Sequence, residues 1–523
     1  MVARDSGLSP RPDVLVVGAG PAGLTTALQA HANGATVRVV ERRPEAFRPS
    51  RAMIMHPRTM ESLRPLGVTA CLLERGDISP KAELHLGRRT VSAELAELDM
   101  PETAFPHLTM LRQMDVEEVL AQALEQRGVT VERGTELVDV TSGPDGHPGP
   151  TATLRSHGGT EEVECRYVAG CDGPTSTVRD LAGIGFHGGT YREEVVLADL
   201  ELDGDLAPGI LHVVAGREGL VFLFALGEGA SWRMLATRPS HDTEVPFGQP
   251  GHEVPASDVQ RLLDASGLGA TVSELRWSAE VRLQHRLATA FRRGSMFLVG
   301  DAAHAHSPAA AQGMNTGMLD AVNLGWKLAF AATAEGERPE LLASYGKERR
   351  PVARQVLALT HAVFFAEAST NPLSSFLRGT LVPLAAPALP FVLKQRWLMA
   401  EVVRMLSQRW VRYRSSVISV EGTADGDGWP RPGDRLPDQD VTYDGRWGRL
   451  HELTARPGVH VLLERDAEGL DQRLLGPHVS VHHLTSHPGR GVLAVRPDGH
   501  VGFRSADADP GQLGAWLDLV GAR

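Results

Sequence analysis

Three glycines near the amino terminus, Gly18, Gly20 and Gly23, have the spacing of a turn that binds a dinucleotide. The first permits a tight turn, the second lets the backbone approach a pyrophosphate, and the third lets a helix pack closely on a strand. The helix that begins at Pro21 directs free N–H groups and a positive dipole end toward the phosphates. Glu41, at the end of the next strand, can accept both hydroxyls of an adenosine ribose. The chemistry indicated is dinucleotide binding.

A second group of chemically capable residues lies near residue 300. The strand predicted over residues 296–299 ends at Gly300 and places Asp301 in a turn, where its carboxylate can bind a sugar-alcohol chain. Residues 313–315 open a helix and offer backbone N–H donors. Such donors suit a ring system that becomes anionic when it is reduced.

Cysteine and histidine give little support for thiol or metal chemistry. The chain has three cysteines and no Cys-x-x-Cys spacing, so neither a disulfide framework nor a thiolate zinc site is expected within one chain. His304 and His306 are spaced as His-x-His, but no carboxylate or thiolate cluster nearby completes a ligand set, and we interpret both as structural. Cys171 is interpreted as a small buried hydrophobe. No metal site is predicted.

The spacing of apolar residues predicts the elements that position these groups. An apolar run at residues 13–18, a helical pattern at 21–33 and a second run at 36–40 form one βαβ unit, which requires a parallel α/β sheet. From about 186 to 282, alternating strands indicate an inserted, mostly antiparallel sheet. A stretch rich in Gly, Asp and Pro at 421–437 indicates a domain boundary. Helices are predicted at residues 116–126, 320–333, 352–367, 395–413 and 510–520.

Composition and charge exclude several classes of protein. A chain of 523 residues, 42% hydrophobic and 22% charged, is expected to form two to four globular domains. A net charge of -11 means that the chain has no excess of basic residues to attract nucleic acid or an anionic membrane. No export signal is visible at the amino terminus, so a cytoplasmic location is expected. The apolar stretch 378–394 is too short to span a membrane and contains three prolines, which indicates a packed or substrate-covering segment.

Three motifs together resemble those of the FAD-dependent aromatic hydroxylases of the para-hydroxybenzoate hydroxylase type, the single-component or class A flavin monooxygenases. They are the glycine-rich turn at residues 18–23, Gly-Cys-Asp-Gly at 170–173 and Gly-Asp at 300–301. The resemblance covers essentially the whole chain. It implies a Rossmann-like FAD-binding domain at 1–185 and 283–420, a substrate domain at 186–282, and a thioredoxin-like domain at 421–523 that lacks Cys-x-x-Cys.

The same resemblance implies roles for individual residues. Arg51 is expected to reach the phosphates, Gln113 and Asp301 to contact the ribityl chain, and Asp172 to lie near both FAD and the nicotinamide cofactor. No catalytic residue is assigned. The implied cofactor-binding residues are Gly18, Gly20, Pro21, Ala22, Gly23, Glu41, Arg42, Arg51, Ala52, Met53, Gln113, Asp172, Gly173, Gly300, Asp301, Pro308, Gly313, Met314 and Asn315.

One stretch departs from the pattern of this family. The family usually reads Pro-x-Gly-Gly-Gln-Gly, whereas Ala310 and Ala311 replace the two central glycines here. The replacements remove freedom to adopt positive φ and add methyl groups beside the expected flavin face. We therefore expect FAD binding to be kept and the shape of the oxygen-reacting pocket to differ.

The implied activity is that of an NAD(P)H-consuming monooxygenase acting on a bulky aromatic, polycyclic polyketide-type substrate. NAD(P)H reduces the flavin, dioxygen adds at C(4a), and the hydroperoxide passes one oxygen atom to the substrate. NAD(P)H is expected to bind transiently, because only one glycine fingerprint is present. Hydroxylation is the expected outcome; Baeyer–Villiger or epoxidising chemistry, or a flavin dehydrogenase that does not use dioxygen, stay open. The protein is expected to be a monomer or a homodimer.

Overall fold

The computed structural model describes residues 11–46, 53–86, 89–141, 149–207, 209–216, 219–225, 229–240, 251–307, 311–368, 395–424, 430–467, 470 and 475–523. The segment 378–394 and three predicted site residues, Arg51, Ala52 and Pro308, lie outside these ranges. Among the described residues, no helix is both long and apolar enough to cross a bilayer.

A six-stranded sheet with the order β17-β18-β11-β1-β2-β7 forms the base of the molecule. Its strands β1, β2, β7, β11 and β18 run parallel, and β17 is antiparallel to β18. Helix α1 (Pro21–Ala32) connects β1 to β2 and buries most of its length, as the predicted βαβ unit requires. The bounds are β1 Val14–Val17, β2 Val37–Glu41, β7 Val131–Arg133, β11 Tyr167–Gly170, β17 Arg292–Arg293 and β18 Met296–Leu298.

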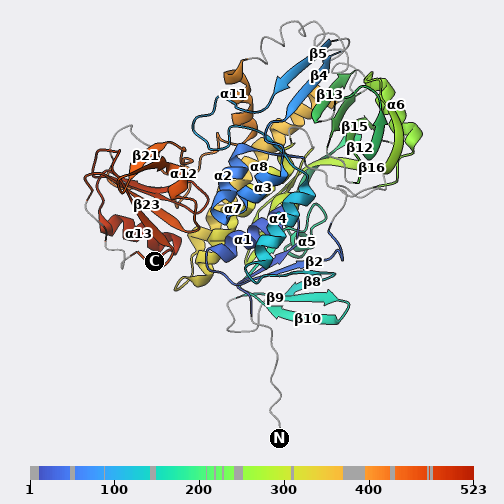
Figure 1. Cartoon of the computed structure of the whole chain (residues 1–523). Coiled ribbons are helices and arrows are strands. Elements are labelled where there is room, and N and C mark those ends of the chain that lie inside the picture. Colours follow the sequence, from blue (N-terminus) through green and yellow to red (C-terminus); the bar gives the residue numbers. More distant parts are fainter. Residues whose placement is uncertain are drawn as a thin grey trace.

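An eight-stranded sheet with the order β19-β16-β12-β15-β14-β13-β4-β5 lies at the opposite end of the molecule (Figure 1). Neighbouring strands are antiparallel, except that β13 and β4 are parallel. Helix α6 (Ala256–Ser266) packs on one face of this sheet through Val259 and Leu263. The bounds are β4 Lys81–Leu86, β5 Arg89–Glu94, β12 Phe186–Asp203, β13 Ile210–Gly216, β14 Gly219–Phe224, β15 Trp232–Pro239, β16 Thr271–Ala288 and β19 His304–Ala305.

Long helices lie between the two sheets, with α1, α7 and α8 near the centre of the view (Figure 1). Helix α8 continues through Pro351, which is why the sequence pattern predicted only its second half. The predicted helix 395–413 ends early, because Gln408 adopts a left-handed conformation with φ of 57° shortly after α11. The bounds are α2 Pro57–Leu63, α3 Thr69–Arg75, α4 Gln113–Glu125, α5 Thr177–Leu181, α7 Gln312–Thr333, α8 Pro339–Ala368 and α11 Arg396–Leu406.

Two smaller sheets complete this part of the fold. One has three antiparallel strands in the order β10-β9-β8, and the other pairs β3 with β6. The bounds are β3 Ile54–Met55, β6 Thr109–Met110, β8 Glu136–Thr141, β9 Thr151–Ser156 and β10 Gly159–Glu164.

The C-terminal residues form a seven-stranded sheet with the order β20-β26-β25-β23-β24-β21-β22. Figure 1 shows this unit beside the central helices. Its last helix, α13, agrees with the helix predicted over residues 510–520, while its likeness to thioredoxin stays a prediction. The bounds are β20 Val420–Glu421, β21 Asp440–Tyr443, β22 Arg446–Arg449, α12 Leu450–Leu453, β23 Val459–Glu464, β24 Val479–Leu484, β25 Val492–Val495, β26 Val501–Ser505 and α13 Pro510–Val520.

A buried ionic cluster joins the C-terminal sheet to the central helices. Glu348 of α8 accepts hydrogen bonds from Lys327 Nζ at 2.7 Å and from both terminal nitrogens of Arg496 at 2.8 Å. Arg496 lies in the turn between β25 and β26, and Asp498 of the same turn accepts from Asn323 Nδ2 at 3.0 Å. Burial lowers the pKa of Lys327 to about 8. The turn is therefore held by charges that no solvent reaches.

Candidate active site

A cavity of about 670 Å³ extends from the turn between β1 and α1 to the eight-stranded sheet and α11. Most of the predicted cofactor-binding residues line it: Gly18, Gly20, Pro21, Ala22, Glu41, Arg42, Met53, Gln113, Asp172, Gly173, Gly300, Asp301, Gly313 and Met314. Gly23 and Asn315 do not line it. Residues that are about 300 positions apart in the sequence thus line one cavity.

The glycine-rich turn has the geometry that its spacing predicts. Gly18 has a φ of +104°, and a Cβ there would lie 2.4 Å from the carbonyl oxygen of Cys171. A Cβ on Gly23 would lie 1.9 Å from the carbonyl oxygen of Gly18, so this glycine allows α1 to pack on β1. A Cβ on Gly20 would meet nothing within 4 Å. Gly20 therefore leaves open space in the cavity where a phosphate can approach the backbone.

Glu41 is fixed at the end of β2. Its Oε2 accepts a hydrogen bond from the backbone N–H of Ala19 at 2.9 Å, and its Oε1 accepts from Arg43 N–H at 3.0 Å. The carboxylate is held beside the glycine turn and keeps lone pairs for a further donor. This placement suits an acceptor of ribose hydroxyls. Arg42 lines the same region, and its guanidinium donates to Thr175 Oγ1 at 3.4 Å.

Asp172 stabilises the turn that follows β11. Its Oδ1 accepts from Ser176 Oγ at 2.5 Å and its Oδ2 from Val178 N–H at 3.1 Å. Burial raises the pKa of this carboxyl group. The side chain thus forms its hydrogen bonds with residues at the start of α5. Gly173, which has no side chain, lines the cavity with its backbone. If Asp172 contacts FAD or a nicotinamide cofactor, its carboxylate must do so while it accepts hydrogen bonds from Ser176 and Val178.

Asp301 lies in a short 3-10 helix, Gly300–Ala302, and is exposed toward the cavity. The turn is held from below by Asp320 of α7, which accepts from Gly300 N–H at 3.3 Å. Asp320 also contacts His304 Nε2 at 2.6 Å and accepts from Arg349 Nε at 2.6 Å. Burial alone would raise the pKa of Asp320, but Arg349 and His304 lower it, so the carboxylate stays charged.

The side chain of Asn315 is held by protein partners. Its Oδ1 accepts from His56 N–H at 2.9 Å and from Thr59 Oγ1 at 2.7 Å. Its Nδ2 donates to the carbonyl oxygens of Ile54 and Ala311, both at 2.9 Å. All its hydrogen-bonding groups point into the protein, so Asn315 fixes the first turn of α7 while Gly313 and Met314 line the cavity.

Ala311 adopts the left-handed conformation, which is more costly for alanine than for the glycine that the family usually has at this position. It has φ of 51° and ψ of 37° and precedes the first residue of α7. An L-residue with a Cβ is strained in this region by roughly 1–2 kcal/mol.

We expect the Ala311→Gly variant to be more stable than the unmodified protein by about 1 kcal/mol, because glycine removes this strain. Chemical denaturation of both proteins measures the difference. Ala400→Gly, at a buried helical position, is the control and should lose stability. A destabilised Ala311→Gly protein would contradict the assigned backbone conformation.

Glu117 of α4 is a buried acid at the dinucleotide end of the cavity, and no sequence motif marks it. It accepts from Gln113 Nε2 at 2.8 Å. Burial raises its pKa from 4.5 to about 7. The residue was missed because its position four residues after Gln113 is also an ordinary spacing on a helix face.

The Glu117→Gln variant should remove a pH dependence of stability. With a folded pKa of about 7 and a reference value of 4.5, Glu117 contributes stability that is complete below pH 4.5 and lost as the pH rises through 7. The FAD-free variant should therefore exceed the unmodified protein at pH 8 by up to about 3 kcal/mol, and match it near pH 4.5. Denaturant unfolding at several pH values measures this. Glu125→Gln, an exposed change on the same helix, should show no such trend.

The other end of the cavity has an apolar wall. Leu211, Phe222 and Phe224 come from β13 and β14, and the two phenyl rings stack with centroids 5.8 Å apart. Val281 and Leu283 of β16 continue the wall. Sequence alternation marked these strands but not the face that is turned inward, because a strand buried on both faces has apolar residues on each.

His306 also lines the cavity, although it was predicted to be structural. Its ring is parallel to that of His304, with centroids 5.9 Å apart. Its Nδ1 is 3.1 Å from the carbonyl oxygen of Ser307, and its buried Nε2 has no partner among the described residues. Burial lowers its pKa. His304 is held by Asp320, as a structural residue is, whereas His306 lines the cavity as a neutral imidazole.

Comparison with known proteins agrees with this geometry. A family model described as the FAD binding domain matches residues 11–360. 6-Methylpretetramide 4-monooxygenase of Streptomyces rimosus is 33% identical over 545 residues, which cover 97% of this chain and 93% of that protein. Pentachlorophenol 4-monooxygenase of Sphingobium chlorophenolicum is 34% identical over 354 residues, covering 67% of this chain and 64% of that protein.

Solved structures show the same architecture over nearly the whole chain. Anhydrotetracycline hydroxylase from Streptomyces rimosus superposes with a TM-score of 0.75 at 28% identity, covering 97% of this chain and 99% of that one. A ternary complex of aklavinone-11 hydroxylase with FAD and aklavinone gives 0.73 at 25% identity, covering 98% and 99%.

The chain therefore belongs to the FAD binding domain family, and its mixed α/β fold is that of the FAD-dependent aromatic hydroxylases. It is an FAD-dependent monooxygenase, an oxidoreductase, and the predicted family resemblance is confirmed. The residues of the cavity fit this cofactor, because Gly20 leaves open space that a pyrophosphate could enter and the fixed carboxylate of Glu41 keeps lone pairs that ribose hydroxyls could use.

Proposed function

We propose that this protein hydroxylates a bulky, polycyclic aromatic compound of the polyketide type, using FAD, dioxygen and NAD(P)H. The observation that carries the proposal is the single cavity that joins a dinucleotide cradle to an apolar wall. A flat aromatic substrate would bury its rings against Leu211, Phe222 and Phe224, which favours polycyclic over small polar compounds. The relatives named for 6-methylpretetramide, anhydrotetracycline and aklavinone support the same class.

When FAD is bound, its ring system can accept a hydride and activate dioxygen. Glu41 and the glycine turn would hold its adenosine and pyrophosphate, and Asp301 would hold its ribityl chain. The N–H groups at Gly313 and Met314, at the start of α7, would favour negative charge on the ring system. Arg51, Ala52 and Pro308 remain proposed contacts of the cofactor.

The remaining residues act on the substrate and on water. The apolar wall excludes water from the reacting atoms, which suppresses unproductive release of reduced oxygen. His306 lines the cavity, and its buried Nε2 has no partner among the described residues; a rotation of the ring would let this nitrogen accept the proton of a bound phenol. A hydroxyl group that is hydrogen-bonded to a neutral imidazole is more electron-rich and directs oxygen transfer to the ring.

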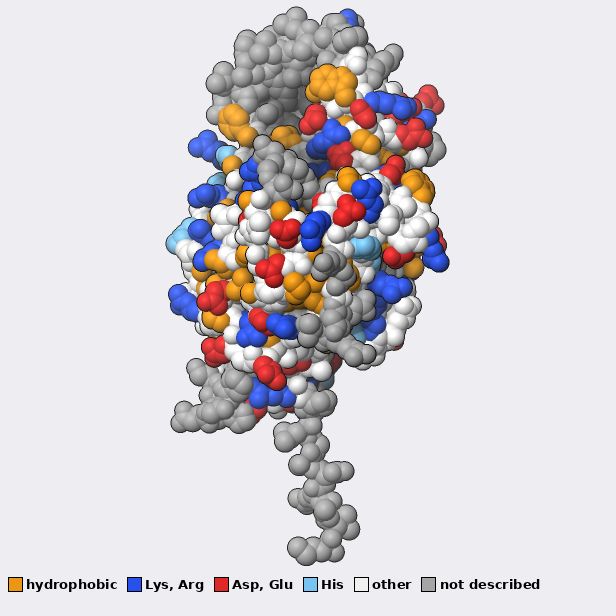
Figure 2. Space-filling model, turned by 90° about the vertical axis from the view of Figure 1, so that its left-hand side faces the viewer, with side chains coloured by type: hydrophobic (Ala, Val, Ile, Leu, Met, Phe, Trp, Pro, Cys, Tyr) orange, Lys and Arg blue, Asp and Glu red, His pale blue; other side chains and the backbone are white. Residues whose placement is uncertain are grey.

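The three-part division at residues 1–185 with 283–420, 186–282 and 421–523 is part of the proposal. The eight-stranded sheet also takes β4, β5 and β19 from outside 186–282. NAD(P)H is proposed to bind transiently, and the protein to act as a monomer or homodimer. Figure 2 shows basic and acidic side chains intermingled on the viewed face, which matches a small-molecule enzyme rather than a polyanion-binding protein.

Labelled dioxygen tests the proposal. The purified protein is supplied with NADH or NADPH and a panel of polycyclic phenols, and the products are analysed by mass spectrometry. One labelled oxygen atom on a ring carbon supports hydroxylation. A labelled atom inside an enlarged ring or in an epoxide indicates the alternative oxygenations, and bound FAD with an unlabelled oxidised product indicates a dehydrogenase. A protein that oxidises NAD(P)H at the same rate without any aromatic compound contradicts the proposal.

A further inference from the structure

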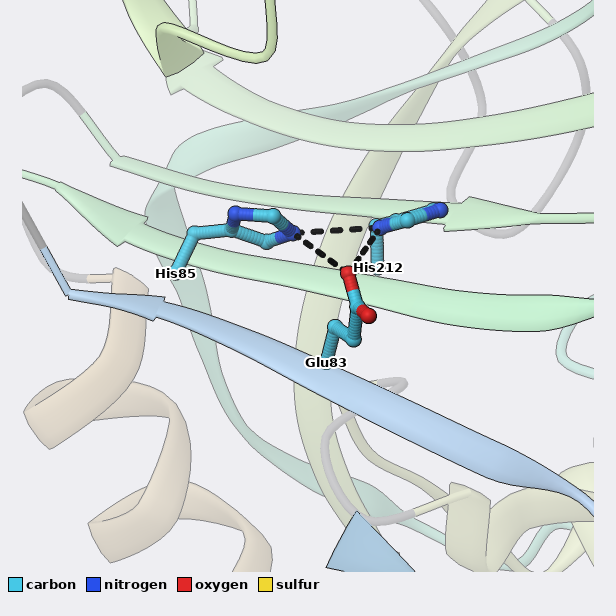
Figure 3. Close-up of side chains that lie close together, drawn as sticks. All are labelled: Glu83, His85 and His212. Atoms are coloured by element: carbon cyan, nitrogen blue, oxygen red, sulfur yellow. Dashed lines mark hydrogen bonds and ion pairs between the residues drawn. The ribbon is translucent and has the colours of Figure 1, made fainter. Parts of the chain in front are cut away.

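Three potential metal ligands meet on the eight-stranded sheet, away from the cavity. Glu83 and His85 lie on β4, and His212 lies on the adjacent parallel strand β13, with Glu83 and His212 as register partners. Leu211 of β13 faces the cavity, so His212, the next residue along the strand, faces the opposite side of the sheet. Figure 3 shows the three side chains pointing toward one another.

The donor atoms are close enough to share one ion. His85 Nε2 lies 3.1 Å from His212 Nδ1, and Glu83 Oε2 lies 3.5 Å from His212 Nδ1 and 3.9 Å from His85 Nε2. A tetrahedral zinc ion with ligand bonds of about 2.0–2.1 Å separates its ligand atoms by roughly 3.3 Å. Small side-chain rotations would bring all three atoms to that spacing.

The second ring nitrogen of His85 has a hydrogen-bond partner that suits a metal ligand. Its Nδ1 lies 3.3 Å from Thr90 Oγ1 of β5, and a hydroxyl oxygen can accept the Nδ1 proton. This leaves the Nε2 lone pair directed at the cluster, as in metal sites where an outer hydrogen bond fixes the histidine tautomer. Burial lowers the pKa of both histidines.

We propose that Glu83, His85 and His212 form a binding site for a divalent transition-metal ion of the zinc class. The side chains of His85 and Glu83 are 19% and 27% exposed. An ion can therefore reach the site from solvent, and a water molecule can occupy its fourth coordination position. Imidazole nitrogens with one carboxylate select Zn²⁺, Ni²⁺ or Cu²⁺ over Mg²⁺ and Ca²⁺. The ion would fasten the β4–β5 hairpin to β13, on the reverse side of the strand that contributes Leu211 to the cavity.

Zinc titration of the FAD-loaded protein tests the site. The protein is first treated with a chelator, and Zn²⁺ binding is followed by calorimetry together with the melting temperature. We expect one Zn²⁺ per chain and a melting temperature that rises with zinc. Glu83→Gln and His85→Ala should each weaken zinc binding at least tenfold and remove that rise. His157→Ala, which removes an exposed histidine elsewhere, should bind zinc as the unmodified protein does.

Further measurements keep the outcome decisive. Circular dichroism and the flavin absorbance show whether each variant is folded, and Thr90→Val, which removes no ligand, should weaken zinc binding more mildly than the ligand variants. Zinc affinity should fall as the pH drops below the histidine pKa values, because protons compete for the same nitrogens. Folded Glu83→Gln and His85→Ala proteins that bind zinc with unchanged affinity and stoichiometry would overturn the proposal. An unmodified protein that binds no zinc would overturn it as well.

Discussion

Replacing Gly20 with valine is expected to abolish FAD binding while the protein still folds. A Cβ at Gly20 meets no protein atom within 4 Å, and Gly20 has φ of -77° and ψ of -179°, which a β-branched residue adopts readily. The added isopropyl group would therefore cost the protein little and would occupy cavity space that a pyrophosphate needs. We expect FAD affinity to fall at least 100-fold, about 2.7 kcal/mol.

Flavin absorbance after gel filtration and titration of the apoprotein with FAD measure the loss. Gly158→Val, in an exposed turn between β9 and β10, is the matched control and should keep wild-type FAD affinity. Gly18→Val is a useful contrast, because its Cβ would collide with Cys171 and should damage the fold itself. A Gly20→Val protein that remains yellow would contradict the assignment of the glycine turn as the pyrophosphate site.

Replacing Glu348 with glutamine is expected to cause the largest loss of stability. Its side chain is 1% exposed and accepts hydrogen bonds from Lys327, Arg496 and Ser416. Glutamine has almost the same shape but no charge, so Asp498 would be the one buried acid left beside the lysine and the arginine among the residues that the structure describes. Removing one member of such a group costs about 3–5 kcal/mol.

Thermal and denaturant unfolding of the Glu348→Gln variant measure this cost. Glu340→Gln lies on the same helix at an exposed position and should change stability by less than about 0.5 kcal/mol. Because Arg496 belongs to the C-terminal sheet, the variant should also loosen that sheet from the central helices, which limited proteolysis would detect. Equal stability of the two variants would show that the cluster does not hold the units together.

The sequence was most informative where local geometry decides the outcome. The glycine turn, the βαβ unit and the position of Asp301 each depend on a few neighbouring residues, and the structure has them as expected. Asn315 shows the limit of motif reasoning, since the motif fixes its position on α7 but not the direction of its side chain. Glu117 was not predicted, and His306 was predicted to be structural rather than to line the cavity, because burial and the pairing of polar atoms depend on contacts with distant segments.

Long-range pairing explains the rest of what the sequence did not reveal. Glu83 and His212 are far apart in the chain and become neighbours only through the parallel pairing of β4 with β13. No periodicity predicts that register. The ionic cluster around Glu348 likewise combines residues from α7, α8 and the β25–β26 turn. In the sequence, each of these charged residues looks like an ordinary surface residue.

The order of strands in the six-stranded sheet also determines when this protein can fold during synthesis. Strand β1 lies between β2, which ends at Glu41, and β11, which begins at Tyr167. At about 5–20 residues per second, a ribosome needs roughly 6 to 25 s to make the intervening chain, and one edge of β1 stays unpaired for that time. The neighbour of β11 arrives later still, at Met296. The nascent chain thus exposes an apolar strand edge while most of the second sheet is translated, so its yield in cells should depend on chaperones that shield such edges.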